Sequence, residues 1–260
     1  MKLYQIDSFT QEIFKGNPAA VCIVEDDLSE NQMQLIATEM NLSETAFVRQ
    51  YDKHCNLRWF TPAREVPLCG HATLAAAHVL WSHGYWPKDQ AIEFNTLSGS
   101  LYTRLEDDLI IMDFPATVPE VNPNIYKPEL EEELGVSILE ILTVPGELML
   151  IMKEEELRNL NPDPGFIGRQ AKNGVMVSAA CNEGAYDFVS RYFAPNLGIN
   201  EDPVTGFMHT ILTPYWAQQL SKQEFNAYQA SARGGEMKTE LKGDRVLLKG
   251  HAVEFFETEI

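Results

Sequence analysis

The stretch from Phe60 to Trp81 constrains the fold most, because a turn-rich loop leads there directly into a wholly apolar helix. Pro62, Pro67 and Gly70 are incompatible with a regular strand or helix in the loop. The apolar residues that follow predict a helix over 71 to 83 that is buried on all sides. The first turn of such a helix presents free backbone N–H groups and the positive end of the helix dipole, so it is a natural anion site.

The same pattern occurs a second time, with a longer loop. Each copy has an arginine, two aromatic residues and a proline, followed by the motif Glu-x-Pro-x-x-Gly. The copies are Arg58, Trp59, Phe60, Pro62, Glu65, Pro67 and Gly70, and Arg191, Tyr192, Phe193, Pro195, Glu201, Pro203 and Gly206. The repeat predicts two similar lobes whose buried helices, 71 to 83 and 207 to 219, begin at one shared cleft. Chance similarity is the alternative, since Phe, Pro and Gly recur in many loops.

The remaining segments predict an α+β protein in which each lobe wraps a mostly antiparallel, barrel-like sheet around its helix. Ser29 and Gln32 form a capping box for a helix that ends near Asn41, and Glu44 follows at a helix-to-strand turn. Strands are expected at 1–9, 18–24, 45–49, 55–60, 91–95, 99–105, 109–114, 138–144, 147–153, 174–179, 186–193, 226–231, 236–241, 245–249 and 252–257.

A connector between the lobes is predicted at 115 to 128, where four prolines occur in fourteen residues. We therefore expect an N-terminal lobe at 1–117 and a C-terminal lobe at 118–260, with the chain end crossing back to the first lobe. Inside the second helix, Pro214 predicts a kink because it cannot donate to the carbonyl four residues earlier.

Composition excludes several classes of function. The chain has 260 residues, 45% of them hydrophobic, and a formal net charge of −18. Nucleic acids and anionic membrane surfaces would be repelled, so neither is an expected partner. The N-terminus lacks the apolar stretch of a signal peptide, and a cytoplasmic location is expected. The four cysteines form no CxxC pair, which predicts free thiols and argues against a zinc site of that type.

Five ionisable residues near the two loops are candidates for chemistry: Glu44, Glu65, His71, Asp202 and His209. Apolar neighbours would shield Glu44 and raise its pKa toward the range of a general base. Each has a simpler structural interpretation as well. Glu44 could be an ordinary turn carboxylate, His71 a helix cap, and Asp202 a turn former before Pro203.

The motifs themselves resemble those of the phenazine biosynthesis PhzF-like family. They are GNPAAV at 16–21, NLSETAFV at 41–48, FTPAREVPLCGHATLAAAHVL at 60–80, EDPVTG at 201–206 and ARGGE at 232–236. The resemblance extends over the whole chain and implies a diaminopimelate-epimerase-like fold with its active site between the lobes. The best-understood member of the family isomerises a dihydro-hydroxyanthranilate by moving a proton, so the resemblance implies proton transfer without metal or organic cofactor.

Residue by residue, the resemblance makes Glu44 the catalytic acid/base. It assigns Gly70, His71 and Asp202 to holding and polarising the substrate, and the helix starts add Thr73 and Gly206 to the substrate-binding set. The expected partner is a small carboxylate substrate, and a homodimer is among the expected assemblies.

Two departures from the family pattern bear on the reaction. Related cofactor-independent racemases use a cysteine in each loop, whereas this chain has Cys69 in the first and Thr205 in the second. A threonine hydroxyl is too weak a base to replace a thiolate, so a two-thiol racemisation is disfavoured. Phe207 and Met208 stand where family members commonly place small residues, which predicts a smaller or less polar substrate or a degraded site.

Three interpretations therefore stay open. The first is a cofactor-independent isomerase with Glu44 as its acid/base. The second is a catalytically degenerate protein that only binds a small molecule. The third is an epimerase that uses Glu44 together with Cys69.

Overall fold

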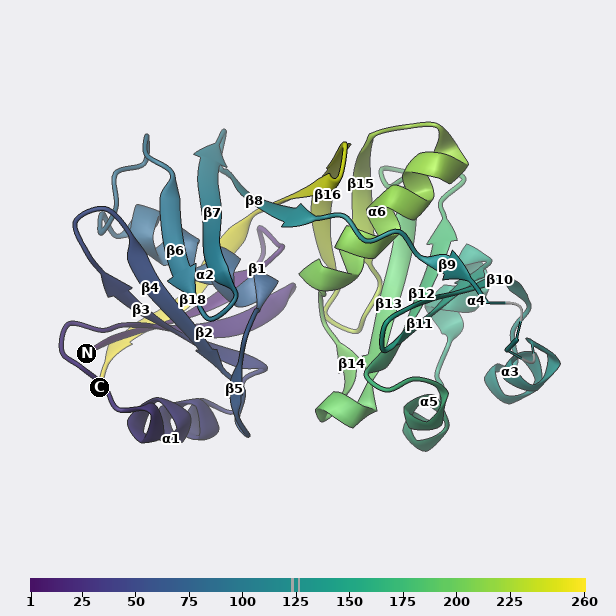
Figure 1. Ribbon diagram of the computed structural model, residues 1–260, viewed down its shortest axis with the longest axis horizontal. Helices are drawn as coiled ribbons and strands as arrows, with labels where there is room; N and C mark the ends of the chain where they lie inside the picture. Colours follow the sequence, from purple (N-terminus) through teal and green to yellow (C-terminus); the bar gives the residue numbers. More distant parts are fainter. Residues whose placement is uncertain (123, 126) are drawn as a thin grey trace. The chain divides into compact units, whose positions relative to one another are not determined.

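The computed structural model describes residues 1–122, 124–125 and 127–260 and divides into two compact units (Figure 1). Unit 1 comprises Met1–Asp113 and Leu247–Ile260, and unit 2 comprises Phe114–Val246. The predicted boundary after residue 117 lies just beyond this division, and the last strand belongs to unit 1. Pro123, part of the predicted connector, lies outside the described residues. The fold is mixed α/β and mostly sheet.

Unit 1 contains a mixed sheet and two helices. Its elements are β1 (Lys2–Ser8), β2 (Asn17–Ile23), α1 (Glu30–Met40), β3 (Glu44–Gln50), β4 (Cys55–Phe60), β5 (Glu65–Val66), α2 (Gly70–Ser82), β6 (Ile92–Thr96), β7 (Gly99–Glu106) and β18 (Ala252–Glu259), with β8 (Leu109–Pro115) and β17 (Arg245–Gly250) crossing the unit boundary. Neighbouring strands pair mostly antiparallel, but β2–β3 and β4–β6 are parallel. A parallel pair needs a crossover, and α1 and α2 supply these two.

Helix α2 is buried, as predicted. Ten of its residues are buried, from His71 to Trp81, and it packs against β1, β2, β3 and β18. The capping box before α1 is also confirmed, since Ser29 accepts from Gln32 N and the Gln32 side chain accepts from Ser29 N. Asn41 ends α1 in the left-handed conformation at φ 50° and turns the chain into β3. The predicted helix-to-strand turn before Glu44 is therefore present.

Unit 2 is also built of strands and helices. Its elements are β9 (Glu120–Val121), α3 (Lys127–Leu134), β10 (Ile138–Val144), β11 (Glu147–Met152), α4 (Glu154–Asn159), α5 (Pro164–Gln170), β12 (Gly174–Ala180), β13 (Phe188–Ala194), the 3₁₀ turn Pro195–Leu197, β14 (Ile199–Asp202), α6 (Gly206–Leu220), β15 (Glu224–Gln229) and β16 (Gly235–Lys242). The pairs β11–β12 and β13–β15 are parallel, with helices α4 and α5 in the first crossover and α6 in the second. The sequence did not predict α4 or α5.

The buried helix α6 continues through Pro214. A proline leaves the carbonyl four residues earlier without its helical donor. That carbonyl belongs to Thr210, and it accepts instead from Thr117 N at 3.1 Å. Residues just after β8 thus supply the hydrogen bond that the helix lacks. Among the described residues, no helix is both long and apolar enough to cross a membrane.

The repeated sequence pattern builds the same local structure in each unit. In unit 1, Arg58 donates to both carboxylate oxygens of Glu65, at 2.6 and 2.7 Å, across the β4–β5 hairpin. In unit 2, Arg191 donates to both oxygens of Glu201, at 2.7 and 2.9 Å, from β13 to β14. Each hairpin is followed by the buried helix of its unit. Glu65, a candidate for chemistry, therefore belongs to a structural ion pair.

The turn before β2 contains a close backbone contact that a substitution can test. Gly16 has φ +63°, and a Cβ there would lie 2.1 Å from the Ser8 carbonyl oxygen. We expect Gly16→Ala to lower the free energy of unfolding by about 3 kcal/mol, from left-handed strain plus overpacking. Gly99→Ala is the control, because Gly99 has φ +95° but open space around it, and it should lose only about 1 kcal/mol. Urea denaturation of both variants measures the difference, and equal losses would contradict the close approach.

Candidate functional site

Glu44 is the first residue of β3, and its side chain is only 15% exposed. The parallel pairing of β2 with β3 places it beside Ala19. The residues after it, Ala46, Phe47 and Val48, are buried as predicted. Glu44 Oε2 lies 3.2 Å from Nε2 of His71. The structure thus brings together two of the predicted site residues within unit 1.

His71 is the second residue of α2 and is 6% exposed. Burial lowers its pKa to about 3, because the charged imidazolium would be poorly solvated. The ring is therefore neutral at neutral pH, and its contact with Glu44 is not an ion pair even though the distance would allow one. Nε2 also lacks a well-aligned hydrogen bond to any described residue. A ring N–H at that position remains available to a third group, such as a substrate oxygen.

Two side chains contact the opposite nitrogen of the His71 ring. Asn17 Nδ2 lies 3.4 Å and Cys69 Sγ 3.5 Å from His71 Nδ1. Both can donate a hydrogen, so Nδ1 is assigned as the acceptor and Nε2 as the protonated nitrogen that faces Glu44. Sequence analysis quoted the GNPAAV motif but gave Asn17 no role. The signal was the glycine-proline turn, which places the buried Asn17 at the start of β2.

The start of α2 explains the other predicted residues of this loop. Gly70 is the first helical residue, and Cys69, the N-cap, makes no side-chain cap hydrogen bond. The first-turn N–H groups are thus not satisfied by that side chain, which suits an anion. Thr73 was predicted to contact substrate, but it is fully buried and its hydroxyl donates to the Cys69 carbonyl at 2.5 Å. We therefore assign Thr73 to holding the first turn.

In unit 2, the turn before α6 is tied together by side chains. Thr205 donates its hydroxyl to Asp202 Oδ2 at 2.5 Å, and its backbone N donates to Gln229 Oε1 at 2.8 Å. Gln229 Nε2 donates to the Asp202 carbonyl at 2.9 Å. Asp202 is half-buried, and Gly206 begins the helix. Gln229 was missed from the sequence, where a glutamine on a strand gives no signal. That Asp202 and Gly206 bind substrate stays a prediction.

Phe207 and Met208, the two bulky residues that depart from the family pattern, differ in their surroundings. Met208 is fully buried and belongs to the core, whereas Phe207 is 47% exposed. Two residues later, His209 is fully buried and its Nδ1 donates to the Thr205 carbonyl at 2.8 Å. Only Phe207 is therefore open to influence a ligand, and His209 stabilises the helix start.

His209 is also expected to affect the stability of the fold in acid. Burial lowers its pKa to about 4, against the smaller opposing effect of its hydrogen bond to Thr205. Since the unfolded chain has the ordinary value of about 6.5, it binds the proton more readily. His209 thus supports folding fully above pH 6.5, and this contribution is lost as pH falls toward 4, by up to about 3 kcal/mol.

Urea titrations between pH 7 and 4 measure this loss. We expect His209→Gln to flatten the fall in stability, whereas the control His54→Gln, at a ring nearer the surface, should leave the slope unchanged. An unchanged slope in His209→Gln would contradict the buried neutral imidazole.

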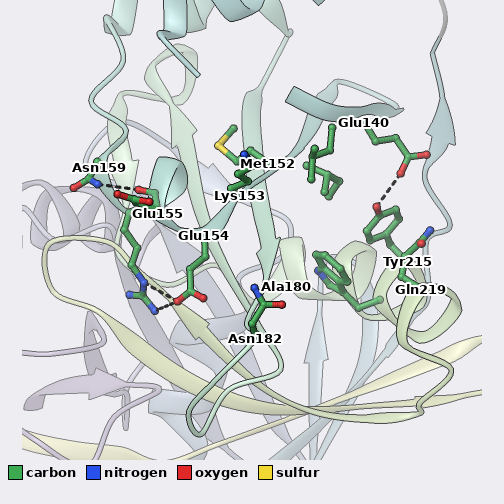
Figure 2. A pocket seen from close by; sticks show the side chains of 14 residues that line it. Glu140, Met152, Lys153, Glu154, Glu155, Asn159, Ala180, Asn182, Tyr215 and Gln219 are labelled. Carbon is green, nitrogen blue, oxygen red and sulfur yellow. Dashed lines mark hydrogen bonds and ion pairs between the residues drawn. The ribbon is translucent and has the colours of Figure 1, made fainter. Parts of the chain in front are cut away.

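A cavity of about 1100 Å³ lies elsewhere in unit 2, between α4, α6 and the ends of β10 and β11 (Figure 2). Two pairs of its polar side chains bond each other. Tyr215 donates to Glu140 at 2.8 Å, and Arg158 pairs with Glu154 at 2.8 Å. The described residues that line it include none of the predicted site residues. The cavity is therefore separate from the candidate chemistry.

Comparison with known proteins agrees with the motifs. A family model described as phenazine biosynthesis-like protein matches residues 6–258. A protein of Halalkalibacterium halodurans named an uncharacterized isomerase is 44% identical, over 99% of this chain and 97% of that protein. The crystal structure of a PhzF-family protein from Enterococcus faecalis superposes with a TM-score of 0.94 at 42% identity, covering 100% of this chain and 98% of that one.

A more distant likeness concerns the fold alone. A hydroxyproline epimerase from Agrobacterium vitis superposes with a TM-score of 0.66 at 13% identity, covering 100% of this chain and 90% of that one. With the family model matched over nearly its whole length, the chain belongs to the phenazine biosynthesis-like family.

Proposed function

We propose that this protein is a cofactor-independent isomerase that moves a proton on a small carboxylate-bearing substrate. The observation that carries the proposal is the shielded Glu44 carboxylate, 3.2 Å from the neutral ring of His71. Relatives named as isomerases support the reaction class.

In this mechanism Glu44 removes a proton from an acidic carbon and returns it to another position of the same molecule. Proton removal leaves negative charge on a conjugated oxygen, which needs a donor. His71 is suited to that role, because a neutral imidazole with hydrogen on Nε2 can donate without first losing a proton to Glu44. The N–H groups at the start of α2, from Gly70 onward, bind the substrate carboxylate.

In unit 2, the family resemblance assigns Asp202 to substrate binding, and the start of α6 adds Gly206. Asp202 and Gly206 are proposed to bind the substrate, with Gln229 and Thr205 fixing the position of Asp202. Asp202→Asn keeps the side-chain size and the hydrogen bond from Thr205, so a raised KM in that variant without loss of stability would support the assignment. An unchanged KM would remove Asp202 from the site.

The reaction is tested by incubating the purified protein with a dihydro-hydroxyanthranilate and a panel of small unsaturated or cyclic carboxylates, without added metal or cofactor. Proton NMR detects the shift of a double bond as new product signals, and mass spectrometry shows that the molecular mass is unchanged. Tight binding of a panel member without any conversion would instead support the catalytically degenerate binding protein.

A second candidate, an epimerase, is favoured by one contact: Cys69 Sγ lies in the same cluster, 3.5 Å from the His71 ring. An epimerase using Glu44 and Cys69 would invert one carbon and leave the double bonds in place. Cys69→Ser separates the two reactions, because it would abolish inversion but leave a Glu44-only isomerisation largely intact.

Phe207 is expected to influence how tightly the protein binds a small carboxylate. A hydroxyl at the first turn of α6 would add a hydrogen bond of about 0.5 to 1.5 kcal/mol to a bound carboxylate, and phenylalanine cannot supply it. We expect Phe207→Ser to bind a small carboxylate more tightly than the unmodified protein, as measured by calorimetry. Since Phe207 is exposed, the variant should fold normally, and equal affinities would show that the ring has no part in binding.

A further inference from the structure

Three side chains of unit 1 form a cluster whose donor atoms suit a transition metal. One ligand atom each from Glu44, Cys69 and His71 lie within 4.8 Å of one another. The set joins a carboxylate oxygen, a thiol sulfur and an imidazole nitrogen. Sulfur and imidazole ligands favour zinc over magnesium or calcium, which prefer oxygen.

The contact between Glu44 and His71 has the separation of two ligands on one ion. Their facing atoms lie 3.2 Å apart, yet Nε2 is not aligned in a hydrogen bond with any described residue. Two ligand atoms bound tetrahedrally to one zinc ion, at the usual bond lengths, are about 3.3 Å apart and point at the ion, not at each other. The Glu44 and His71 side chains can therefore accept an ion without moving apart. The Cys69 thiol, which contacts Nδ1 at 3.5 Å, has to turn about its Cα–Cβ bond to reach an ion on Nε2.

Charge also fits. The carboxylate of Glu44 and the thiolate of Cys69 together balance a doubly charged ion. The Cys69 thiol loses its proton to solvent when it binds the ion.

Asn17 completes the surroundings of the imidazole. When Nε2 binds the ion, the ring hydrogen moves to Nδ1, which lies 3.4 Å from the Asn17 carboxamide. A half-turn of that carboxamide presents its oxygen to Nδ1–H. Metal-bound histidines generally donate their other N–H to such an acceptor.

We propose that Glu44, Cys69 and His71 bind one Zn²⁺ ion per chain and that zinc inhibits the protein. The ion occupies the Glu44 oxygen that would remove the substrate proton and the His71 nitrogen that would donate to the substrate. Binding releases one proton from Cys69 and leaves a fourth coordination position for water. The inhibition rests on the proposed function, whereas the binding does not.

Calorimetric titration of the chelator-treated protein with Zn²⁺ tests the binding without any substrate. We expect one ion per chain and the release of one proton, measured by repeating the titration in buffers of different ionisation enthalpy. Cobalt(II) in place of zinc should give the ultraviolet charge-transfer band of a metal–thiolate bond.

Two variants and two controls locate the ion. Cys69→Ser and Glu44→Gln should each weaken zinc binding more than tenfold, because even loss of a residue that only supports a ligand costs about 10- to 100-fold. Cys181→Ser, at the one cysteine that is not buried, should change nothing. His83→Asn tests the other His/Glu cluster, which consists of His83, Glu254 and Glu257. In it His83 lies 2.6 Å from Glu254, and Glu257 already forms an ion pair with Lys2.

Absence of a saturable one-site isotherm, unchanged affinity in Cys69→Ser, or loss of binding only in His83→Asn would each overturn the proposed site. Circular dichroism of the variants separates loss of a ligand from loss of the fold. If zinc binds as expected but no substrate is ever converted, the zinc site stands and the proposed isomerase does not.

Discussion

Replacing Glu44 with glutamine is expected to lower turnover by at least about 10²-fold, because a general base typically contributes 10²- to 10⁴-fold. Glutamine keeps the size of the side chain and its place at the start of β3 but has no basic oxygen. The substrate should still bind, since the N–H groups of α2 and the ring of His71 are unchanged. The expected result is therefore a lower kcat with a similar KM.

The matched control is Glu12→Gln in the same unit, at a carboxylate whose side chain is 69% exposed and which pairs with Lys15. That variant should keep full activity. Thermal unfolding of both proteins shows whether the fold is preserved. A Glu44→Gln protein with wild-type kcat would rule out Glu44 as the acid/base.

The second large effect is expected at Arg191, which anchors the hairpin before α6. Its side chain is 11% exposed and donates to both oxygens of Glu201 and to the carbonyls of Leu157 and Leu160, at 3.1 and 2.5 Å. Arg191→Ala would leave a largely buried carboxylate and two carbonyls without their donor. Breaking a buried pair from one side costs about 3 to 5 kcal/mol, and we expect a loss of unfolding free energy in that range.

Arg58→Ala is the natural control, because the repeat gives Arg58 the same bidentate bond to Glu65. The two carboxylates are similarly buried, with Glu65 17% and Glu201 22% exposed, but the Arg58 side chain is 32% exposed. Solvent can therefore replace part of what is lost, and about 1 kcal/mol is expected. Urea denaturation of the two variants compares equivalent positions in the two units. Equal losses would show that burial does not decide the strength of these pairs.

Hydrophobic pattern and turn residues were sufficient to predict the elements around the site. The apolar runs from His71 to Trp81 and from Met208 to Ala217 can only be buried helices, and both are. The capping box at Ser29 fixed the start of α1. The repeated arginine and glutamate form equivalent ion pairs in the two units, which the repeat alone did not predict.

What the sequence could not show depends on contacts between distant segments. The short helix α5, Pro164–Gln170, begins with Asp163 as its cap, and a helix of about two turns has too little periodicity to be recognised. The approach of Asn17 to His71 depends on the packing of α2 against β2, which local pattern does not specify. Thr73 was placed in the site from its position, but its hydroxyl bonds to the backbone of its own helix.

The central claim is that Glu44 moves a carbon-bound proton, and exchange with solvent tests it most directly. The protein is incubated in D₂O with a dihydro-hydroxyanthranilate or with any panel carboxylate that it converts, and deuterium in substrate and product is followed by NMR and mass spectrometry. The account predicts deuterium at the carbon that receives the proton with the wild-type protein, and exchange at least about 10²-fold slower with Glu44→Gln. Equal exchange by the two proteins, or conversion without any exchange in either, would contradict it.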